Sequence, residues 1–272
     1  MKVILSRKGF DSVSGGMMSP IMPNGDLLSM PIPSGGDPYS YREVFCRGRS
    51  LREILLELNP RFNYGDCHLD PDIEKSRHAH VPKGWKPAFG QANSAASFLT
   101  NTVKVEKGDV FLFFGNFHAT EKRNGRLQFT HRRGDFYKDS DLHVIWGYLQ
   151  VGEIIHDQRR IAKEFPWHPH AVDFRTGDER NTLYVASQRL SFASELSGAG
   201  VLPYDLKRVL TLCGAKRSVW RKSKAYLPSN IIGNRKNLES AQSKGIRYGG
   251  QWQELPLKPS DASFAFAKEI IL

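Results

Sequence analysis

The sequence predicts an α+β fold in which peripheral helices surround a mixed or antiparallel sheet. The clearest strand signals are the apolar runs at 110–115 and 143–155,. A helical period of apolar residues over 50–58 indicates a flanking helix,. Gly, Pro and Asn residues punctuate the intervening segments, and the chain contains no internal repeat,.

The length of 272 residues favours one elaborated domain or two closely packed halves,. Forty per cent of the residues are hydrophobic, which is enough for a sizeable core. No apolar run reaches the roughly 18 residues of a membrane span, and the N-terminus lacks the apolar core of a secretory signal. We therefore expect a cytoplasmic protein with no membrane partner. Three cysteines far apart match neither a zinc-site spacing nor a disulfide framework: Cys46, Cys67 and Cys213,.

Local signals place the individual elements. Ser50 and Glu53 form a capping-box pattern at the start of the first helix, and Asn59-Pro60 ends it,. Asn124-Gly125 is typical of a hairpin turn,. The predicted strands are 3–5, 27–32, 110–115, 127–130, 143–155, 181–186 and a closing strand at 264–267, and the predicted helices are 50–58, 91–99, 206–212 and 218–225.

The net charge of +11 is concentrated near the C-terminus. Residues 206–247 contain eleven Lys and Arg and a single acid, Glu239, so the remainder of the chain is close to neutral. A dense basic cluster attracts polyanions and is the expected electrostatic footprint of nucleic-acid binding; the alternative is a solvated face. The predicted nucleic-acid contacts are Lys216, Arg217, Trp220, Arg221, Lys222 and Lys224.

A polar, glycine-rich loop follows the first predicted strand. Glycines allow backbone N–H groups to approach an anion, and Arg and Lys supply charge, so a phosphate or nucleotide suits this loop. The spacing does not match a P-loop. The alternative is a turn with surface charges. We predict substrate binding by Ser6, Arg7, Lys8, Gly15 and Gly16, and a catalytic role for Asp11.

The segment His68-Leu69-Asp70-Pro71-Asp72 could bring an imidazole and two carboxylates together. Alternate residues of an extended segment point to the same side. Such a group can bind a divalent metal or act as a general base, whereas the alternative is a turn whose Asp side chains cap backbone amides. Because the spacing fixes no further ligand, we predict catalytic roles for His68, Asp70 and Asp72 and assign no metal ligand.

Further substrate-binding candidates are Trp85, Gln91, His143, His168 and His170. Trp85 could stack on a base, and Gln91 could hydrogen-bond a base edge. The two histidines of His168-Pro169-His170 could bind phosphate or a metal, or form an ordinary polar turn. A structural role is favoured for His143, which opens an apolar strand. Signatures of common hydrolases and dehydrogenases are missing, so no cofactor is identified.

Two resemblances follow from these segments. Gly108-Asp109, the strand after it and 143–154 resemble small barrels of the PUA and ASCH kind, which places a barrel-like core at about 103–190,. The ordered set at 6–12, 68–72, 84–91, 108–115 and 143–154 resembles the nucleotide modification associated domain, third class. The resemblance covers residues 1–225 and leaves 226–272 as a basic extension packed on that domain.

That family is associated with phage and bacterial DNA-modification genes, so the resemblance implies a setting and no particular reaction. Its implied partners are DNA or nucleotides, together with other DNA-modification enzymes. The first hypothesis is an enzyme of DNA base or nucleotide modification. The alternatives are a non-catalytic, PUA-like reader of modified DNA and a metal-dependent nuclease. The enzyme hypothesis requires one cleft that contains Arg7, Asp11, His68, Asp70 and Gln91.

Overall fold

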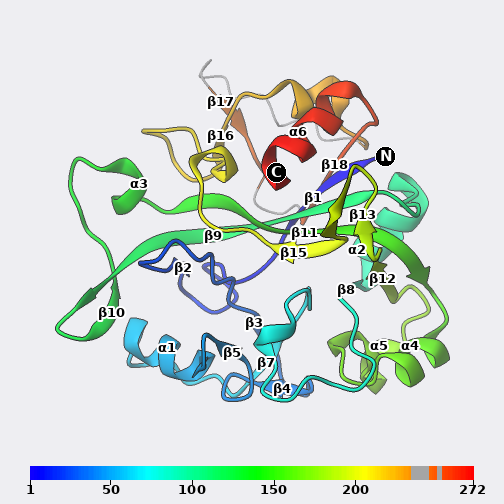
Figure 1. The fold of residues 1–272 in the computed structure, drawn as a ribbon, viewed down its shortest axis with the longest axis horizontal. Coiled ribbons are helices and arrows are strands. Elements are labelled where there is room, and N and C mark those ends of the chain that lie inside the picture. Colours follow the sequence, from blue (N-terminus) through cyan, green and yellow to red (C-terminus); the bar gives the residue numbers. More distant parts are fainter. Residues whose placement is uncertain (234–244, 250–252) are drawn as a thin grey trace.

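The computed structural model describes residues 1–233, 245–249 and 253–272, and its central feature is a large mixed sheet (Figure 1). β1 runs parallel to β9, and the other neighbours along the main path are antiparallel. The path is β18 (Glu254–Leu257), β1 (Val3–Arg7), β9 (Val110–Arg123), β11 (Leu142–Ile155), β12 (Thr182–Ala186) and β8 (Ala88–Gln91). Shorter strands flank it: β2 (Ser19–Ile21) and β10 (Arg126–Phe129) pair with β9, and β15 (Ala199–Val201) pairs with β11. The predicted α+β class is confirmed.

The central strands are rich in apolar residues because both faces of the sheet are covered,. In β1, Val3 and Leu5 pack on one face, whereas Ile4 packs on the other. On the first face the core includes residues of α6 (Asp261–Ile271). Figure 1 shows α6 on one side of the sheet and α1 (Leu51–Leu58) on the opposite side.

The predicted barrel is not found among the described residues, and the strands of 103–190 lie in the middle of an open sheet. The sheet ends at two edge strands, β18 and β8, which have no backbone pairing with each other in the described part of the chain. The edges meet only through side chains, since Gln91 Nε2 donates to Glu254 Oε1 over 2.6 Å. The strand pattern of 103–190 led to a wrong prediction of a barrel. It contains no information on β1 and β18, which come from the two ends of the chain and extend the sheet.

Several predicted elements are confirmed. α1 starts with the predicted capping box: Ser50 Oγ accepts from the Glu53 amide, and the Glu53 carboxylate accepts from the Ser50 amide. β9 and β10 form the predicted hairpin around Asn124-Gly125, where both residues have positive φ. The second predicted helix begins later, at α2 (Asn93–Ser97), because Gln91 still belongs to β8.

Three predictions near the C-terminal half were wrong. Residues 264–267 lie in α6, where the period of the buried residues Ser263, Ala267 and Ile270 is helical. The predicted helix 218–225 contains β16 (Val219–Arg221), which pairs with β17 (Gly245–Arg247). Only Leu206–Arg208 of the predicted helix 206–212 is helical, as a 3-10 turn.

The strand predicted at 27–32 was also wrong, since only its last residue belongs to a strand, β3. The remaining strands are short: β3 (Ile32–Pro33), β4 (Tyr39–Ser40), β5 (Phe45–Cys46), β6 (Arg49–Ser50), β7 (Asp66–His68), β13 (Arg189–Leu190) and β14 (Ala193–Ser197). The remaining α-helices are α3 (Phe136–Asp139), α4 (Gln158–Glu164) and α5 (Asp173–Thr176).

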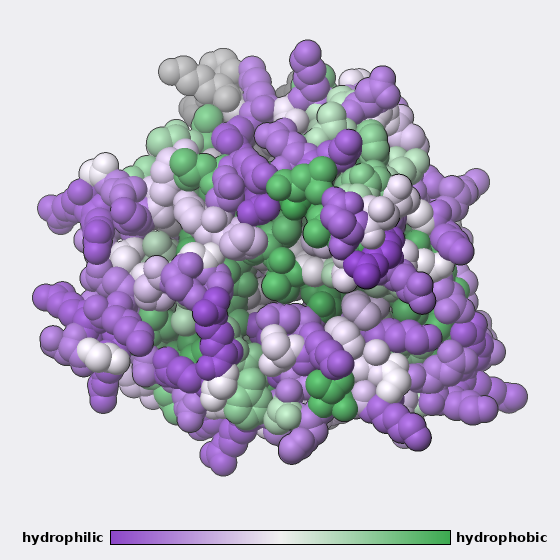
Figure 2. Space-filling model, in the orientation of Figure 1, coloured by the Kyte–Doolittle hydropathy of each residue, from purple (hydrophilic) through white to green (hydrophobic). Residues whose placement is uncertain are grey.

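The outer surface is predominantly hydrophilic in the face that Figure 2 shows, with hydrophobic residues gathered near its centre. Among the described residues, every helix is too short or too polar to cross a membrane. The division into 1–225 and a basic extension stays a prediction, although β18 from the second segment pairs with β1 from the first.

Candidate active-site cleft

A cleft lies at the seam where the two edge strands of the sheet meet. It consists of adjoining pockets of about 150 Å³ and 540 Å³ that share five lining residues. The smaller pocket is lined by all five residues that the enzyme hypothesis requires together: Arg7, Asp11, His68, Asp70 and Gln91. The five come from four segments: the end of β1 with the loop after it, the end of β7, the segment after β7, and the end of β8. The fold thus gathers the predicted polar groups.

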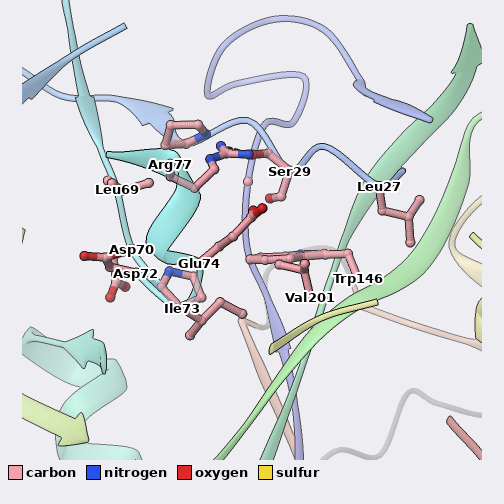
Figure 3. A pocket seen from close by; sticks show the side chains of 13 residues that line it. Leu27, Ser29, Leu69, Asp70, Asp72, Ile73, Glu74, Arg77, Trp146 and Val201 are labelled. Atoms are coloured by element: carbon pink, nitrogen blue, oxygen red, sulfur yellow. Dashed lines mark hydrogen bonds between the residues drawn. The ribbon is translucent and has the colours of Figure 1, made fainter. Parts of the chain in front are cut away.

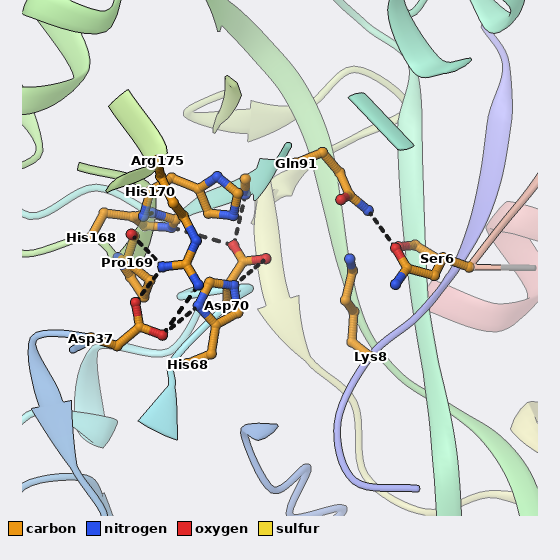
Figure 4. Close-up of polar contacts among 12 residues, drawn as sticks. Ser6, Lys8, Asp37, His68, Asp70, Gln91, His168, Pro169, His170 and Arg175 are labelled. Atoms are coloured by element: carbon orange, nitrogen blue, oxygen red, sulfur yellow. Dashed lines mark hydrogen bonds and ion pairs between the residues drawn. The ribbon is translucent and has the colours of Figure 1, made fainter. Parts of the chain in front are cut away.

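One wall of the cleft carries His68, Asp70 and His170. Their nearest donor atoms all lie within 4.8 Å of one another, and the two imidazole rings have centroids 5.3 Å apart. His68 Nε2 is 3.9 Å from Asp70 Oδ2. Figure 4 shows the three side chains converging from separate segments. His170 enters from the 3-10 turn Pro169–Ala171, about 100 positions along the chain from His68.

Asp37 fixes the orientation of His68. Asp37 Oδ2 is 3.0 Å from His68 Nδ1, and the same carboxylate is bound by the guanidinium of Arg175. Burial alone would raise the pKa of Asp37, but the hydrogen bonds from His68 and Arg175 lower it to about 2. Because an ionised carboxylate can only accept, His68 donates through Nδ1–H. The other ring nitrogen, Nε2, lies on the side of Asp70.

Asn181 fixes His170 in the same way. The Asn181 amide nitrogen donates to the carbonyl of His170 and to Gln158 Oε1, so Asn181 Oδ1 is the acceptor for His170 Nδ1, at 2.6 Å,. Burial lowers the pKa of His170 to about 3. His170 is therefore neutral, with its hydrogen on Nδ1 and a lone pair on Nε2.

Asp70 lies between the histidines, with only 2% of its side chain exposed. Its Oδ1 accepts from the amide of Gly90 at 2.7 Å and lies 3.4 Å from His168 Nε2. His168 Nδ1 accepts from the His170 amide, which leaves the ring hydrogen on Nε2, facing Asp70,. Burial opposes ionisation, but the hydrogen bond from His168 holds the pKa of Asp70 below its usual range.

Gly90 allows the two walls to approach this closely. A Cβ atom at Gly90 would lie 2.2 Å from the His170 ring, a distance that side chains do not tolerate. A glycine in a strand interior often marks such a close approach.

The opposite wall carries Lys8, Gln91 and Glu254 around Ser6. Glu254 is buried; its Oε1 accepts from Ser6 Oγ at 3.0 Å and from Gln91 Nε2, and it lies 3.8 Å from Lys8 Nζ. Its Oε2 has no hydrogen-bond partner among the described residues. Burial raises the pKa of Glu254, although Lys8 opposes this. Figure 4 shows Lys8 and Gln91 between the Asp70 cluster and Ser6.

Asp72 does not join this site, which corrects the prediction that three alternate residues converge. Its carboxylate is 2.9 Å from His78 Nε2 and accepts from Trp85 Nε1 at 2.8 Å. Asp72 lines a separate pocket of only about 30 Å³, shown in Figure 3, which is too small for a nucleotide,. Trp85 is likewise absent from the lining of the cleft, because its indole is engaged with Asp72.

The structure places the two predicted substrate-binding glycines of the first loop away from the cleft. Gly16 donates its N–H to the Asp11 carbonyl, and neither Gly15 nor Gly16 lines the cleft. Gly15 is required for packing, since a Cβ there would lie 2.4 Å from the Phe10 ring. Asp11 Oδ1 accepts from the amides of Val13 and Ser14, so this carboxylate also holds the loop.

Trp220 and His143 form part of the core, which corrects their predicted roles in binding. Trp220 is fully buried, stacks on Tyr248 at 4.6 Å between ring centroids, and donates its Nε1–H to His143 Nδ1 at 2.8 Å. Burial lowers the pKa of His143 to about 3. His168 is also fully buried and contacts the cleft residues Asp70 and His170 without lining the cleft itself.

The other predicted nucleic-acid contacts fall into two groups, arginines with partners inside the protein and exposed lysines. Arg217 pairs with Asp141, and Arg221 donates to the Lys207 carbonyl, so both guanidinium groups have structural partners. The three lysines that are exposed are Lys216, Lys222 and Lys224. Four other charged residues of the basic cluster lie outside the described residues: Arg235, Lys236, Glu239 and Lys244.

Sequence reasoning missed four residues that shape the site: Asp37, Arg175, Asn181 and Glu254. Asp37 lies in Gly35-Gly36-Asp37-Pro38, whose turn composition is an available signal,. Glu254 opens the apolar strand β18, where a lone carboxylate is unusual,. Nothing in the sequence around Arg175 indicates that its partner lies more than 100 positions away. Nothing around Asn181 indicates that its partner is a histidine.

The fold and the site define the class of protein: an α+β domain with an open mixed sheet and a polar cleft at the seam between its edge strands. The family model described as "Nucleotide modification associated domain 3" matches residues 2–259. The chain belongs to this family, and the family description indicates involvement in nucleotide modification. Comparison with curated proteins and with solved structures gave no match.

Proposed function

We propose that this protein is an enzyme that modifies DNA bases or nucleotides, and that its reaction takes place in the cleft at the seam of the sheet. The observation that carries this proposal is the convergence of Arg7, Asp11, His68, Asp70 and Gln91 on one pocket. Acid–base, cationic and amide groups gathered in one concave site are the usual parts of a catalytic centre. The family membership supplies the substrate class.

The cleft offers a separate group for each part of a nucleotide. Arg7 and Lys8 supply positive charge for phosphate, since Arg and Lys form strong charge-assisted hydrogen bonds with phosphate oxygens,. Gln91 has an amide that can pair with a base edge. Asp70, oriented by the Gly90 amide, is the candidate general base, and buried Glu254, with its raised pKa, is a candidate general acid,.

The cleft also has an appropriate size. Ligand pockets usually occupy roughly 300–1,000 Å³. The larger of the two adjoining pockets has a volume of about 540 Å³ and extends past Gln91 to α2. The smaller one is lined by Asp11, His68 and Asp70, and Glu254 lines the larger one.

Removal of the two cations tests the assignment of the phosphate subsite. We expect Arg7→Ala combined with Lys8→Ala to weaken the binding of deoxynucleoside monophosphates and triphosphates at least about tenfold, because each charge-assisted hydrogen bond contributes about 1.5–3 kcal/mol. Isothermal titration calorimetry measures the change. The charge-matched control is Lys83→Ala with Lys86→Ala, two exposed lysines that do not line the cleft. Equal affinities of the two double variants would contradict the assignment.

The exposed lysines favour a second role, the docking of a polynucleotide. We expect Lys216→Ala, Lys222→Ala and Lys224→Ala together to weaken DNA binding and to flatten its dependence on salt, by about 0.9 in the log–log slope for each phosphate that is no longer neutralised. Fluorescence anisotropy at several salt concentrations provides the slope. Lys83→Ala, Lys86→Ala and Lys163→Ala form the control triple, which removes three exposed charges elsewhere. An unchanged slope in the first triple would exclude these lysines as the docking surface.

An assay for chemical change in the nucleotide, added to the salt titration, separates the enzyme from a reader. A non-catalytic reader binds DNA without turnover. The PUA resemblance no longer supports a reader, because the described sheet does not close into a barrel. Salt-sensitive binding with no chemical change in any nucleotide would favour the reader over the enzyme.

A further inference from the structure

We propose that His68, Asp70 and His170 bind one divalent transition-metal ion. Their donor atoms lie within 4.8 Å of one another, which is the spacing of groups that can converge on a single ion. The set consists of two imidazole nitrogens and one carboxylate oxygen. Two histidines and one carboxylate, with positions left open, form a well-attested transition-metal site.

The distances also leave room for an ion. Nδ1 of His68 contacts Asp37, and Nδ1 of His170 contacts Asn181. The 3.9 Å between His68 Nε2 and Asp70 Oδ2 is too long for a hydrogen bond,. The donor atoms of the three residues therefore lie close together, within 4.8 Å, without a direct hydrogen bond between His68 and Asp70.

Each proposed ligand has an outer partner that fixes its direction. Asp37 and Arg175 hold His68, Asn181 and Gln158 hold His170, and the Gly90 amide and His168 hold Asp70. Metal-binding histidines almost always donate their second ring N–H to a carboxylate or carbonyl, and ligating carboxylates are themselves hydrogen-bonded. A cluster that served only to pack the protein would not need every ring oriented in this way.

The donor set selects the kind of metal. Imidazole suits Zn²⁺ and Fe²⁺, whereas Mg²⁺ and Ca²⁺ prefer oxygen ligands throughout. His68 and His170 line both pockets of the cleft, so the remaining coordination positions face the space where a substrate would bind. Three protein ligands with an open position are typical of catalytic metal sites, whereas structural sites are closed.

The metal site and the proposed function share Asp70, but they are tested by separate measurements, since metal binding is measured without any nucleotide. The full chain is stripped with a chelator, dialysed, and titrated with Zn²⁺ or Co²⁺, with bound metal measured by elemental analysis and the Co²⁺ spectrum. We expect about one ion per chain in the wild type and at least tenfold weaker binding in His68→Ala and His170→Ala. His156→Ala, a change at an exposed histidine outside the cleft, is the control and should bind as the wild type does.

Asp37→Asn tests the outer partner without touching a proposed ligand. We expect it to weaken Zn²⁺ binding by about 10- to 100-fold, the usual effect of losing such a partner, while circular dichroism shows a folded chain. This variant keeps the proposal testable where a histidine variant does not fold. Wild-type protein that binds no Zn²⁺ or Co²⁺ would overturn the proposal, as would wild-type affinity in the ligand variants or equal competition by Mg²⁺. Loss of nucleotide binding with metal binding intact would count against the proposed function alone.

Discussion

Asp70→Asn is expected to lower the turnover of the nucleotide substrate by about 10²- to 10⁴-fold, the contribution of a positioned general base, while the chain stays folded. The substitution removes the charge of the Asp70 carboxylate but keeps an oxygen that can accept from the Gly90 amide. Weaker hydrogen bonds at a buried position cost about 1–3 kcal/mol, which most folded domains tolerate. Turnover, the midpoint of thermal unfolding and circular dichroism are to be measured on the same preparation.

Asp72→Asn is the matched control, because Asp72 is an equally buried carboxylate two residues away. It lies outside the cleft lining and holds His78 and Trp85, so its loss should lower stability and leave turnover close to that of the wild type. Equal activity losses in the two variants would show that the effect comes from a general disturbance of 68–72. Wild-type turnover in Asp70→Asn would remove Asp70 from the reaction.

Trp220→Ala is expected to lower the free energy of unfolding by about 3–5 kcal/mol, the usual cost of emptying a large aromatic site in a core. The change deletes a fully buried ring that stacks on Tyr248 and meets Phe114 edge-on. It also deprives His143 Nδ1 of its hydrogen-bond donor. Denaturant unfolding followed by circular dichroism measures the loss.

Trp220→Phe separates packing from hydrogen bonding at this position. It keeps an aromatic ring but removes the Nε1–H donor to His143, so the expected loss is smaller, about 1–3 kcal/mol,. If Trp220 instead contacted nucleic acid, both variants would keep wild-type stability and lose DNA affinity. That result would contradict its position in the core.

Local patterns predicted the fold where neighbours along the chain decide the structure. The capping box at Ser50 and Glu53 and the turn at Asn124-Gly125 need only a few adjacent residues, and both were confirmed. Phe264-Ala265-Phe266-Ala267 was misread because four alternating residues do not distinguish period 2 from the period 3.6 of α6,. The prediction of a barrel was wrong for another reason. The pairing of β18 with β1 joins opposite ends of the chain, and no local sequence pattern indicates such a pairing.

In the site, too, contacts between residues close in sequence could be predicted, whereas contacts between distant residues could not. The convergence of His68 and Asp70 follows from their spacing of two, whereas Asp72 turns to His78 and Trp85, whose positions the spacing cannot give. His170 reaches Asp70 only because the turn after α4 packs against β8, close to Gly90. The basic residues of 216–224 illustrate the limit of charge counting. Arg217 and Arg221 have partners within the protein, whereas Lys216, Lys222 and Lys224 are exposed.

The most direct test of the central claim, that this protein modifies DNA bases or nucleotides, is mass spectrometry of nucleosides. DNA and the free nucleotide pool are compared between cells that express the wild-type chain, cells that express Asp70→Asn and cells without the gene. We expect a nucleoside mass that occurs with the wild type and is lost with both Asp70→Asn and the deletion. Identical nucleoside profiles in all three, with the wild-type protein folded and expressed, would contradict the claim.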